Sequence, residues 1–379
     1  MLPEALPYHL KVRDYFKKQT STWEFFAAAR TREEQLAAFQ TELLKNSYQF
    51  RRETDTALYD KVDQAREKLG LGQLPVTVYQ AQYGNDPELN ASIIFLQEQA
   101  HIVFTGPILE KLNETELLAV IAHELTHVRL FTVLGGELEV ADRIITAIAN
   151  NHNSEPSYYE TARLFKLYTE IFCDRGAFAV VGSTGPVISS LVKVATGLAE
   201  VNAEGYVQQA EEIFFAAPGT QSVMPTHPEN FIRARALKFW ADGIGGGNEG
   251  AITGMIEGRP ELDRLDLFAQ IELKSLTREF LQEFLQPEWF QSELVMALAK
   301  EYFNDFRVAG EGASERLAAV LSDAHPSIQD YFSYVLLDFA LADPSLEDAP
   351  VGRGREFARV LGLTAAFEAA YMARKIGEK

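Results

Sequence analysis

Residues 8–70 carry the hydrophobic pattern of helices. Apolar residues such as Trp23, Phe26 and Phe39 recur with charged residues between them, and Gly70 is a suitable stop. Three short segments rich in β-branched and aromatic residues follow, and they predict strands at 75–80, 92–96 and 101–105. So small a sheet is stable only with helices packed against it. We therefore expect a small antiparallel sheet in a mainly helical α+β domain.

The helical period returns after Gly106-Pro107 and continues to about Trp240. Ala241 to Pro260 then holds seven glycines and no periodic apolar pattern, which is typical of a flexible connection. Beyond it the chain is helical again, with breaks at 310–313 and 343–354. The predicted organisation is a domain at 1–240 with an N-terminal helical part at 1–70, a glycine-rich linker at 241–260, and an all-α domain at 261–379.

Charge and composition narrow the classes of function. The chain has 379 residues and a net charge of -19, from 54 Asp and Glu against 35 Lys and Arg. Because a protein this acidic has few basic side chains to neutralise phosphates, we expect no nucleic-acid partner. One cysteine cannot close an intrachain disulfide. The charged N-terminus lacks a signal-peptide pattern, and no apolar run reaches about 18 residues, so we expect no transmembrane segment and a cytoplasmic protein.

The clearest chemical motif is His123-Glu-Leu-Thr-His127. It lies on a predicted helix that Asn113 begins as N-cap, with Glu116 at the capping-box position. Two histidines four apart leave one face of a helix and can share a metal ion. This is the arrangement of zinc hydrolases, in which Glu124 would act as general base on a water that the zinc acidifies.

A chance occurrence of this pattern is the alternative. The chain has only seven histidines, and the residues around the motif, Leu117–Ala122 and Leu125, are apolar. Carrying two histidines and a glutamate into an apolar interior without a function would be costly. We therefore favour the metal site.

A catalytic zinc takes three protein ligands, so a third one is needed. The metzincin pattern fails, because Leu130 stands where a glycine is required. Glu137 and Glu139 follow His127 too closely for a separate helix to fold back. Glu170 is better placed on a long helix, with Asp174 one turn later. Two carboxylates at this spacing repel each other unless a cation joins them, which favours Glu170 as ligand and Asp174 as the group that orients an imidazole.

Two alternatives stay open at this point. Lys166 and Glu170 could be an ordinary surface pair at i,i+4. His227-Pro228 could simply begin a helix, as His325-Pro326 does later in the chain. However, Arg233 follows His227 by six residues, and together they could stabilise a tetrahedral oxyanion.

The order of these motifs resembles a known family. HELTH, then Glu170-Ile-Phe-Cys-Asp174, then Thr226-His-Pro with Arg233, is similar to gluzincin endopeptidases of the HtpX, BepA and CaaX prenyl protease type. The resemblance covers about residues 70–240. It implies a zincin-type catalytic domain that binds one Zn²⁺ per chain.

The resemblance also implies roles for particular residues. His123, His127 and Glu170 would be the zinc ligands, Glu124 the base, and Asp174 the carboxylate behind a ligand. His227 and Arg233 would assist the transition state or close over the metal. Cys173 stands where the family usually has Ala, and we interpret it as a core residue.

The C-terminal part resembles a TerB-like helical domain, through Tyr334–Asp343 and a later helix that ends in Leu361-Gly-Leu363. Pro344 replaces the usual glycine, and Asp343, Glu347 and Asp348 match the family's acidic loop only loosely. A helical accessory bundle without a metal is the alternative. In either case we expect an interaction module for a regulatory protein partner.

These observations predict a zinc endopeptidase acting on peptide or protein substrates. The rival hypothesis is a latent or non-catalytic zinc-binding scaffold. The intact Glu124 favours catalysis, because a structural zinc site needs no base.

Overall fold

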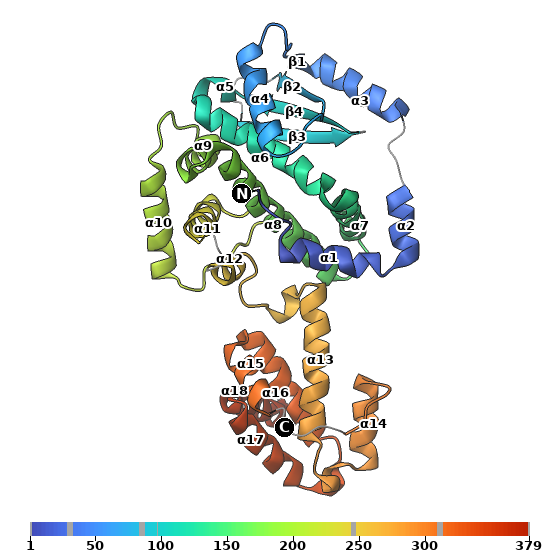
Figure 1. The fold of residues 1–379 in the computed structure, drawn as a ribbon. Helices are drawn as coiled ribbons and strands as arrows, with labels where there is room; N and C mark the ends of the chain where they lie inside the picture. Colours follow the sequence, from blue (N-terminus) through green and yellow to red (C-terminus); the bar gives the residue numbers. More distant parts are fainter. Residues whose placement is uncertain are drawn as a thin grey trace. The chain divides into compact units, whose positions relative to one another are not determined.

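The structure is a computed structural model that describes residues 2–28, 33–82, 88–96, 98–243, 248–308 and 314–377, with side chains left out at 33–37, 314 and 377. The chain forms two compact units (Figure 1). The first unit comprises residues 1–154 and 161–258, and the second comprises 155–160 and 259–379.

The first unit holds a small sheet and most of the helices. Its strands are β1 (Ser47–Gln49), β2 (Val76–Ala81), β3 (Asn90–Leu96) and β4 (Gln99–Thr105). Its helices are α1 (Pro7–Lys17), α2 (Thr20–Ala28), α3 (Glu33–Asn46), α4 (Thr56–Lys68), α5 (Ile108–Lys111), α6 (Glu114–Thr132), α7 (Glu137–Ala149), α8 (Pro156–Val181, whose first residues lie in the second unit), α9 (Thr184–Thr196), α10 (Ala203–Ala216), α11 (Asn230–Asp242) and α12 (Glu249–Ile256). The predicted mainly helical α+β fold is therefore confirmed.

The sheet differs from the antiparallel one predicted. Its order is β1-β2-β4-β3, and β2 and β4 are parallel, so the sheet is mixed. β4 is the most buried strand, and its Ile102 lies between Val78 of β2 and Ile93 of β3. Burial thus draws β4 to the interior of the sheet, although β3 precedes it in the chain. β3 pairs only with β4 among the described strands, so its other edge is free.

The fourth strand, β1, lies inside the segment predicted to be helical. It pairs with the end of β2, with Ser47 opposite Ala81. Three residues are too few to produce an alternating pattern, so pairing with β2 defines this strand more than its own sequence does.

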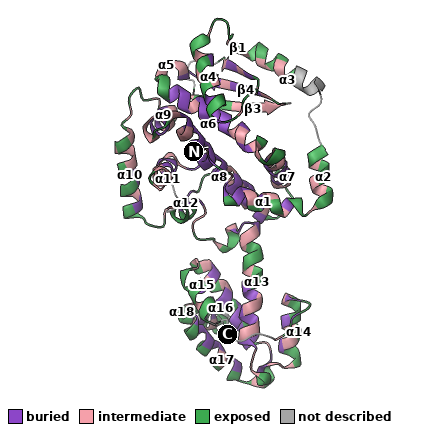
Figure 2. Ribbon diagram, in the orientation of Figure 1, coloured by how far each residue is buried: buried purple, intermediate pink, exposed green. Residues whose placement is uncertain are grey.

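One face of the sheet and the two longest helices of this unit enclose its core. Val78, Ile102 and Phe104 pack with α4 and with the apolar residues of α6. Figure 2 shows buried residues along α6 and α8, which cross the middle of the unit. The helix with the HELTH motif is therefore fixed between the sheet and α8.

The predicted linker at 241–260 is only partly irregular. α12 occupies residues 249–256, and its Ile252, Met255 and Ile256 are buried. Ser222 N donates a hydrogen bond to Met255 O, which ties this helix to the loop before α11. Three apolar residues on one short helix were enough for burial despite the glycines around them. Gly245, Gly246 and Gly247 lie outside the described residues.

The second unit contains helices and no strand among its described residues. Its core contains many phenylalanines, among them Phe280, Phe332, Phe357 and Phe367. The predicted break at 343–354 is shorter than expected, because α17 already begins at Ala349. The remaining helices are α13 (Leu267–Phe284), α14 (Glu293–Tyr302), α15 (Ser314–Asp323), α16 (Pro326–Ala340), α17 (Ala349–Val360) and α18 (Thr364–Gly377).

One stretch of the described residues is long and apolar enough to cross a membrane by length and composition alone. It is Glu114–Ala149, with a mean hydropathy of 1.5 in its most apolar window, of which 61% is buried inside the protein. The burial is that of a core helix, and this stretch contains the HELTH motif.

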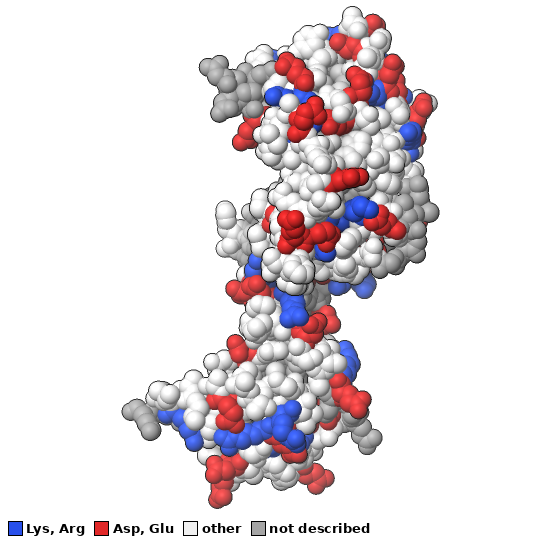
Figure 3. All heavy atoms as spheres, turned by 90° about the vertical axis from the view of Figure 1, so that its left-hand side faces the viewer, with Lys and Arg blue, Asp and Glu red and all other residues white. Residues whose placement is uncertain are grey.

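On the face that Figure 3 shows, acidic side chains are spread out with Lys and Arg between them.

Candidate metal centre and active-site cleft

α6 begins as the sequence predicts. Asn113 Oδ1 accepts hydrogen bonds from the backbone of Thr115 and Glu116, and Glu116 Oε2 accepts one from Asn113 N at 2.9 Å. This capping box satisfies amide groups that the first turn leaves without partners. The helix then carries His123 and His127 on one face, with their ring centroids 5.2 Å apart.

α8 lies very close to α6 where Gly176 faces Thr126. A Cβ atom on Gly176 would lie 2.1 Å from Thr126 Oγ1, which only glycine avoids. Thr126 Oγ1 itself donates to Ala122 O at 2.6 Å. This close approach brings Glu170 and Asp174 of α8 against the two histidines.

Glu170 faces both imidazoles. Its Oε2 lies 3.3 Å from His123 Nε2, and its Oε1 lies 3.7 Å from His127 Nε2. Oε2 is buried and makes no hydrogen bond to the described residues. Glu170 is therefore not the surface residue of the alternative interpretation, and each of its two oxygens lies close to one of the imidazoles.

The spacing of these atoms fits a zinc ion. Bonds of about 2.0–2.1 Å in a tetrahedron place neighbouring ligand atoms about 3.3–3.4 Å apart. The separations of 3.3 Å between Oε2 and His123 Nε2 and of 3.7 Å between Oε1 and His127 Nε2 are close to that value. Two imidazoles and a carboxylate are also a donor set that zinc accepts in catalytic sites.

Asp174 lies behind His123. Its Oδ1 is 3.1 Å from His123 Nδ1, and Arg233 donates to both of its oxygens, from Nε at 2.8 Å and from Nη2 at 2.6 Å. When His123 is neutral, an ionised Asp174 holds its proton on Nδ1 and leaves the Nε2 lone pair for a metal ion.

Arg233 and His227 both reach Glu170, from different environments. Arg233 is buried, and its Nη1 lies 3.3 Å from Glu170 Oε2. His227 is 62% exposed, and its Nε2 lies 3.4 Å from Glu170 Oε1. In the other His-Pro pair, His325 is the N-cap of α16 and accepts a hydrogen bond from Ser327 N. His227 does not have this position, because the N-cap of α11 is Glu229. His227 thus differs from the simple helix start in the same chain, and its role at an oxyanion stays a prediction.

Burial and neighbouring charges shift the pKa values in the metal-free site. Burial lowers the pKa of His123, but the carboxylates of Asp174 and Glu170 outweigh it and raise the value to about 10. Burial lowers the pKa of His127 to about 4 and raises that of Glu124 to about 7. Burial also opposes ionisation of Glu170, but Arg233 and His123 hold its pKa well below the usual range. Glu170 is therefore a carboxylate, as a ligand must be.

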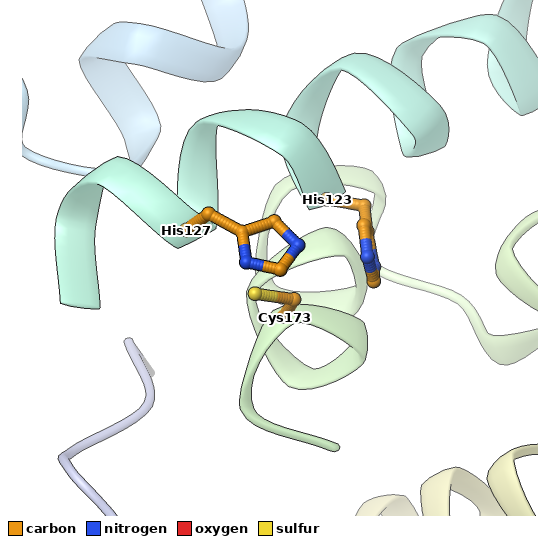
Figure 4. A group of neighbouring side chains, drawn as sticks. All are labelled: His123, His127 and Cys173. Atoms are coloured by element: carbon orange, nitrogen blue, oxygen red, sulfur yellow. The ribbon is translucent and has the colours of Figure 1, made fainter. Parts of the chain in front are cut away.

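Cys173 is the third member of a group with the two histidines, in which one ligand atom from each lies within 4.8 Å of the others. Figure 4 shows its sulfur directed toward the ring of His127. Burial, followed by the charges of Glu170 and Glu124, raises the pKa of this thiol well above its usual value. We favour Glu170 as the third ligand, because its carboxylate is ionised and lies close to both imidazoles, whereas the thiol is neutral in the metal-free site.

These side chains open into a cleft of about 1060 Å³. His123, Glu124, His127 and Glu170 all line it, together with β3, α9 and α7. Motif analysis missed the walls from α7 and α9, because their residues carry no catalytic pattern. The close approach at Gly176 was missed as well, since a single glycine inside a helix has no such signal.

Comparison with known proteins supports part of this interpretation. Residues 53–134 match the model of Peptidase family M48, a stretch that includes α4, the strands β2, β3 and β4, and the HELTH motif of α6. The match supports a metallopeptidase, and it ends before Glu170, Asp174, His227 and Arg233. Neither the curated proteins nor the solved structures give a significant match to the chain.

Proposed function

We propose that the protein is a zinc-dependent endopeptidase with one Zn²⁺ per chain. His123, His127 and Glu170 would hold the ion. The convergence of the two Nε2 atoms and a buried carboxylate within 3.3 and 3.7 Å is the observation that carries this proposal. The family match over the segment with the first two ligands supports it.

A zinc ion in this position would polarise the scissile carbonyl and make a water molecule more acidic. Glu124 would take the proton of that water and pass it to the leaving amide nitrogen. Glu124 is suited to this task, because it lines the cleft beside His123 and burial raises its pKa to about 7.

The remaining site residues would position and assist. Asp174, fixed by Arg233, would hold His123 in the tautomer that binds metal. His227 is exposed beside Glu170 and could donate a hydrogen bond to the developing oxyanion. Arg233 would act mainly through Asp174, because two of its donors already bind that carboxylate.

The substrate would be a peptide or an extended segment of a protein. The free edge of β3 lines the cleft, and its backbone could pair with an extended chain. Such pairing uses only the backbone of the substrate and needs neither of its chain ends, which favours an endopeptidase. We also propose that the second unit is related to TerB-like domains and binds a regulatory protein partner. The proposed location of the protein is the cytoplasm.

A latent enzyme or a zinc-binding scaffold is the second candidate. His227 Nε2 lies 3.4 Å from Glu170 Oε1, which is the separation expected between two ligands of one zinc ion. If His227 occupied the fourth position, no water could be activated there. Replacing His227 with Ala would then raise activity, whereas it would lower activity if His227 assists the transition state.

The test is hydrolysis of an unstructured protein by zinc-loaded enzyme, read by mass spectrometry of the products. We expect internal cleavage that a chelator stops and added zinc restores. About one zinc per chain by elemental analysis should accompany this activity and be lost in His123→Ala. Full zinc content without cleavage, in both the unchanged protein and His227→Ala, would favour the scaffold.

A further inference from the structure

The cleft extends beyond the histidines in both directions along α6. α9 packs at the start of α6, where Lys193 Nζ and Ser189 Oγ each donate to the Glu116 carboxylate at 2.9 Å. α7 follows the end of α6 after a short turn at 133–136. Both helices line the cleft, so a bound peptide would contact α9 on one side of the scissile bond and α7 on the other.

The α9 side of the cleft is apolar. Most of its lining side chains are apolar, and besides Ser190 and Thr196 they are Val120 of α6 with Val187, Leu191, Val194 and Ala195 of α9. Such a wall favours a large apolar side chain of the substrate, because binding there removes its surface from water.

The α7 side of the cleft is acidic. Its lining residues include Phe131, Glu139, Asp142 and Arg143. Arg143 Nε pairs with Glu139 Oε1 at 3.2 Å, and Arg143 Nη2 donates to Phe26 O, so these two charges compensate each other. Asp142 forms no ion pair within 4 Å in the described part of the chain.

The carboxyl group of Asp142 is poorly compensated for its position. Burial raises its pKa to about 6, and Lys166 and Thr146, which act in the opposite direction, do not offset this. A cationic side chain entering the cleft would supply the missing charge, and Phe131 could cover its aliphatic stem. The net charge of -19 would also attract basic peptides.

We propose that the cleft selects peptides with a large apolar residue on the α9 side of the scissile bond and a lysine or arginine on the α7 side, and that Asp142 determines the basic preference. This inference rests on the proposed peptidase function and names its substrate class. Along α6, the four residues from His127 to Phe131 rise by about 6 Å, the length of about two extended peptide residues. The basic residue should therefore lie two or three positions from the scissile bond.

Binding to an inactive protein tests the inference separately from catalysis. The probe is a fluorescent peptide with leucine on one side of the central bond and lysine two or three positions away on the other. The comparison peptide is identical except that norleucine replaces the lysine. We expect Glu124→Gln protein to bind the lysine peptide about tenfold more tightly by fluorescence anisotropy, and we expect Asp142→Asn in that background to remove the difference.

The matched control is Glu137→Gln. Glu137 is on the same helix, pairs with Lys17 and Arg13, and does not line the cleft, so this change should leave the preference intact. Equal affinity for the two peptides, no binding of either, or the same loss in both variants would overturn the inference. Failure of the peptidase proposal would be seen separately, as zinc-loaded wild-type protein that cleaves no bond.

Discussion

Glu170 is the residue on which the metal site depends most, because it contacts four site residues. Its carboxylate faces His123, His127, His227 and Arg233 at 3.3–3.7 Å. Two of these partners are the proposed histidine ligands, and Arg233 keeps the carboxylate ionised.

Glu170→Gln should therefore weaken zinc binding strongly, since a neutral amide coordinates zinc poorly. Asp174→Asn should weaken it less, by about 10–100-fold, as expected for a partner that orients a ligand. The measurement is zinc retention against a competing chelator. Glu160→Gln, on the same helix and 4.0 Å from Arg264, is the control. Retention by Glu170→Gln at the control level would remove Glu170 from the site.

His9 on α1 predicts how stability depends on pH. It is fully buried against α8, and burial lowers its pKa from 6.5 to about 3. The unfolded chain therefore takes up this proton at a higher pH than the folded protein. The contribution of neutral His9 to the stability of the folded protein is complete above pH 6.5 and is lost as the pH falls from 6.5 toward 3.

The free energy of unfolding should thus drop by about 2 kcal/mol from this group between pH 7.5 and 5.0. Urea denaturation at the two pH values measures this drop. His9→Phe, which removes the titrating group but keeps a ring, should show a drop smaller by that amount. His152→Gln changes an exposed histidine and should behave like the unchanged protein. Identical drops in all three proteins would refute the assignment.

At the scale of elements, the crossing of α6 and α8 builds the site. Gly176→Ala would place a methyl group against Thr126, 2.1–2.7 Å from three of its atoms. We expect a loss of about 1–3 kcal/mol in the free energy of unfolding, because the two helices must separate. Weaker zinc binding should follow, since Glu170 and Asp174 move with α8.

Gly254→Ala is the matched control for this change. Apart from the backbone of its own helix and its chain neighbours, no atom of the described residues lies within 4 Å of the methyl group it would add in α12, so it should stabilise the helix by about 0.5–1 kcal/mol. Urea denaturation and zinc retention measure both variants. An equal gain in stability from the two substitutions would show that the helices do not need the close approach.

The sequence predicted the elements whose signals are local. The Asn113 capping box marked the start of α6, and the spacing of His123 and His127 predicted their shared face. The parallel pairing of β2 with β4 was not predictable, because it depends on which strand is buried, and α12 was hidden by its glycines. Asp142 carries no motif, and its role depends on α7 lining the cleft, which only the three-dimensional structure reveals.

At the scale of the whole molecule, all proposed ligands lie in the first unit. Its described residues include the sheet, the cleft and every residue proposed for catalysis. The second unit has a separate core of its own. We therefore expect the first unit to be the catalytic part and the second unit to be an accessory part.

A chain ending at Gly258 should therefore fold and keep about one zinc. Elemental analysis and near-UV circular dichroism would measure metal content and side-chain packing. The full-length protein is the reference for both measurements. Loss of the metal together with unfolding would contradict the division and indicate that the two parts depend on each other.

The central claim is that Glu124 acts as base beside a zinc ion held by His123, His127 and Glu170. The most direct measurement is the rate of peptide-bond hydrolysis by Glu124→Gln and by the unchanged protein at equal zinc content. Glutamine keeps the size of the side chain but not its basicity, so we expect zinc to stay and the rate to fall by about 100-fold or more. Equal rates in the two proteins, both loaded with zinc, would contradict the account.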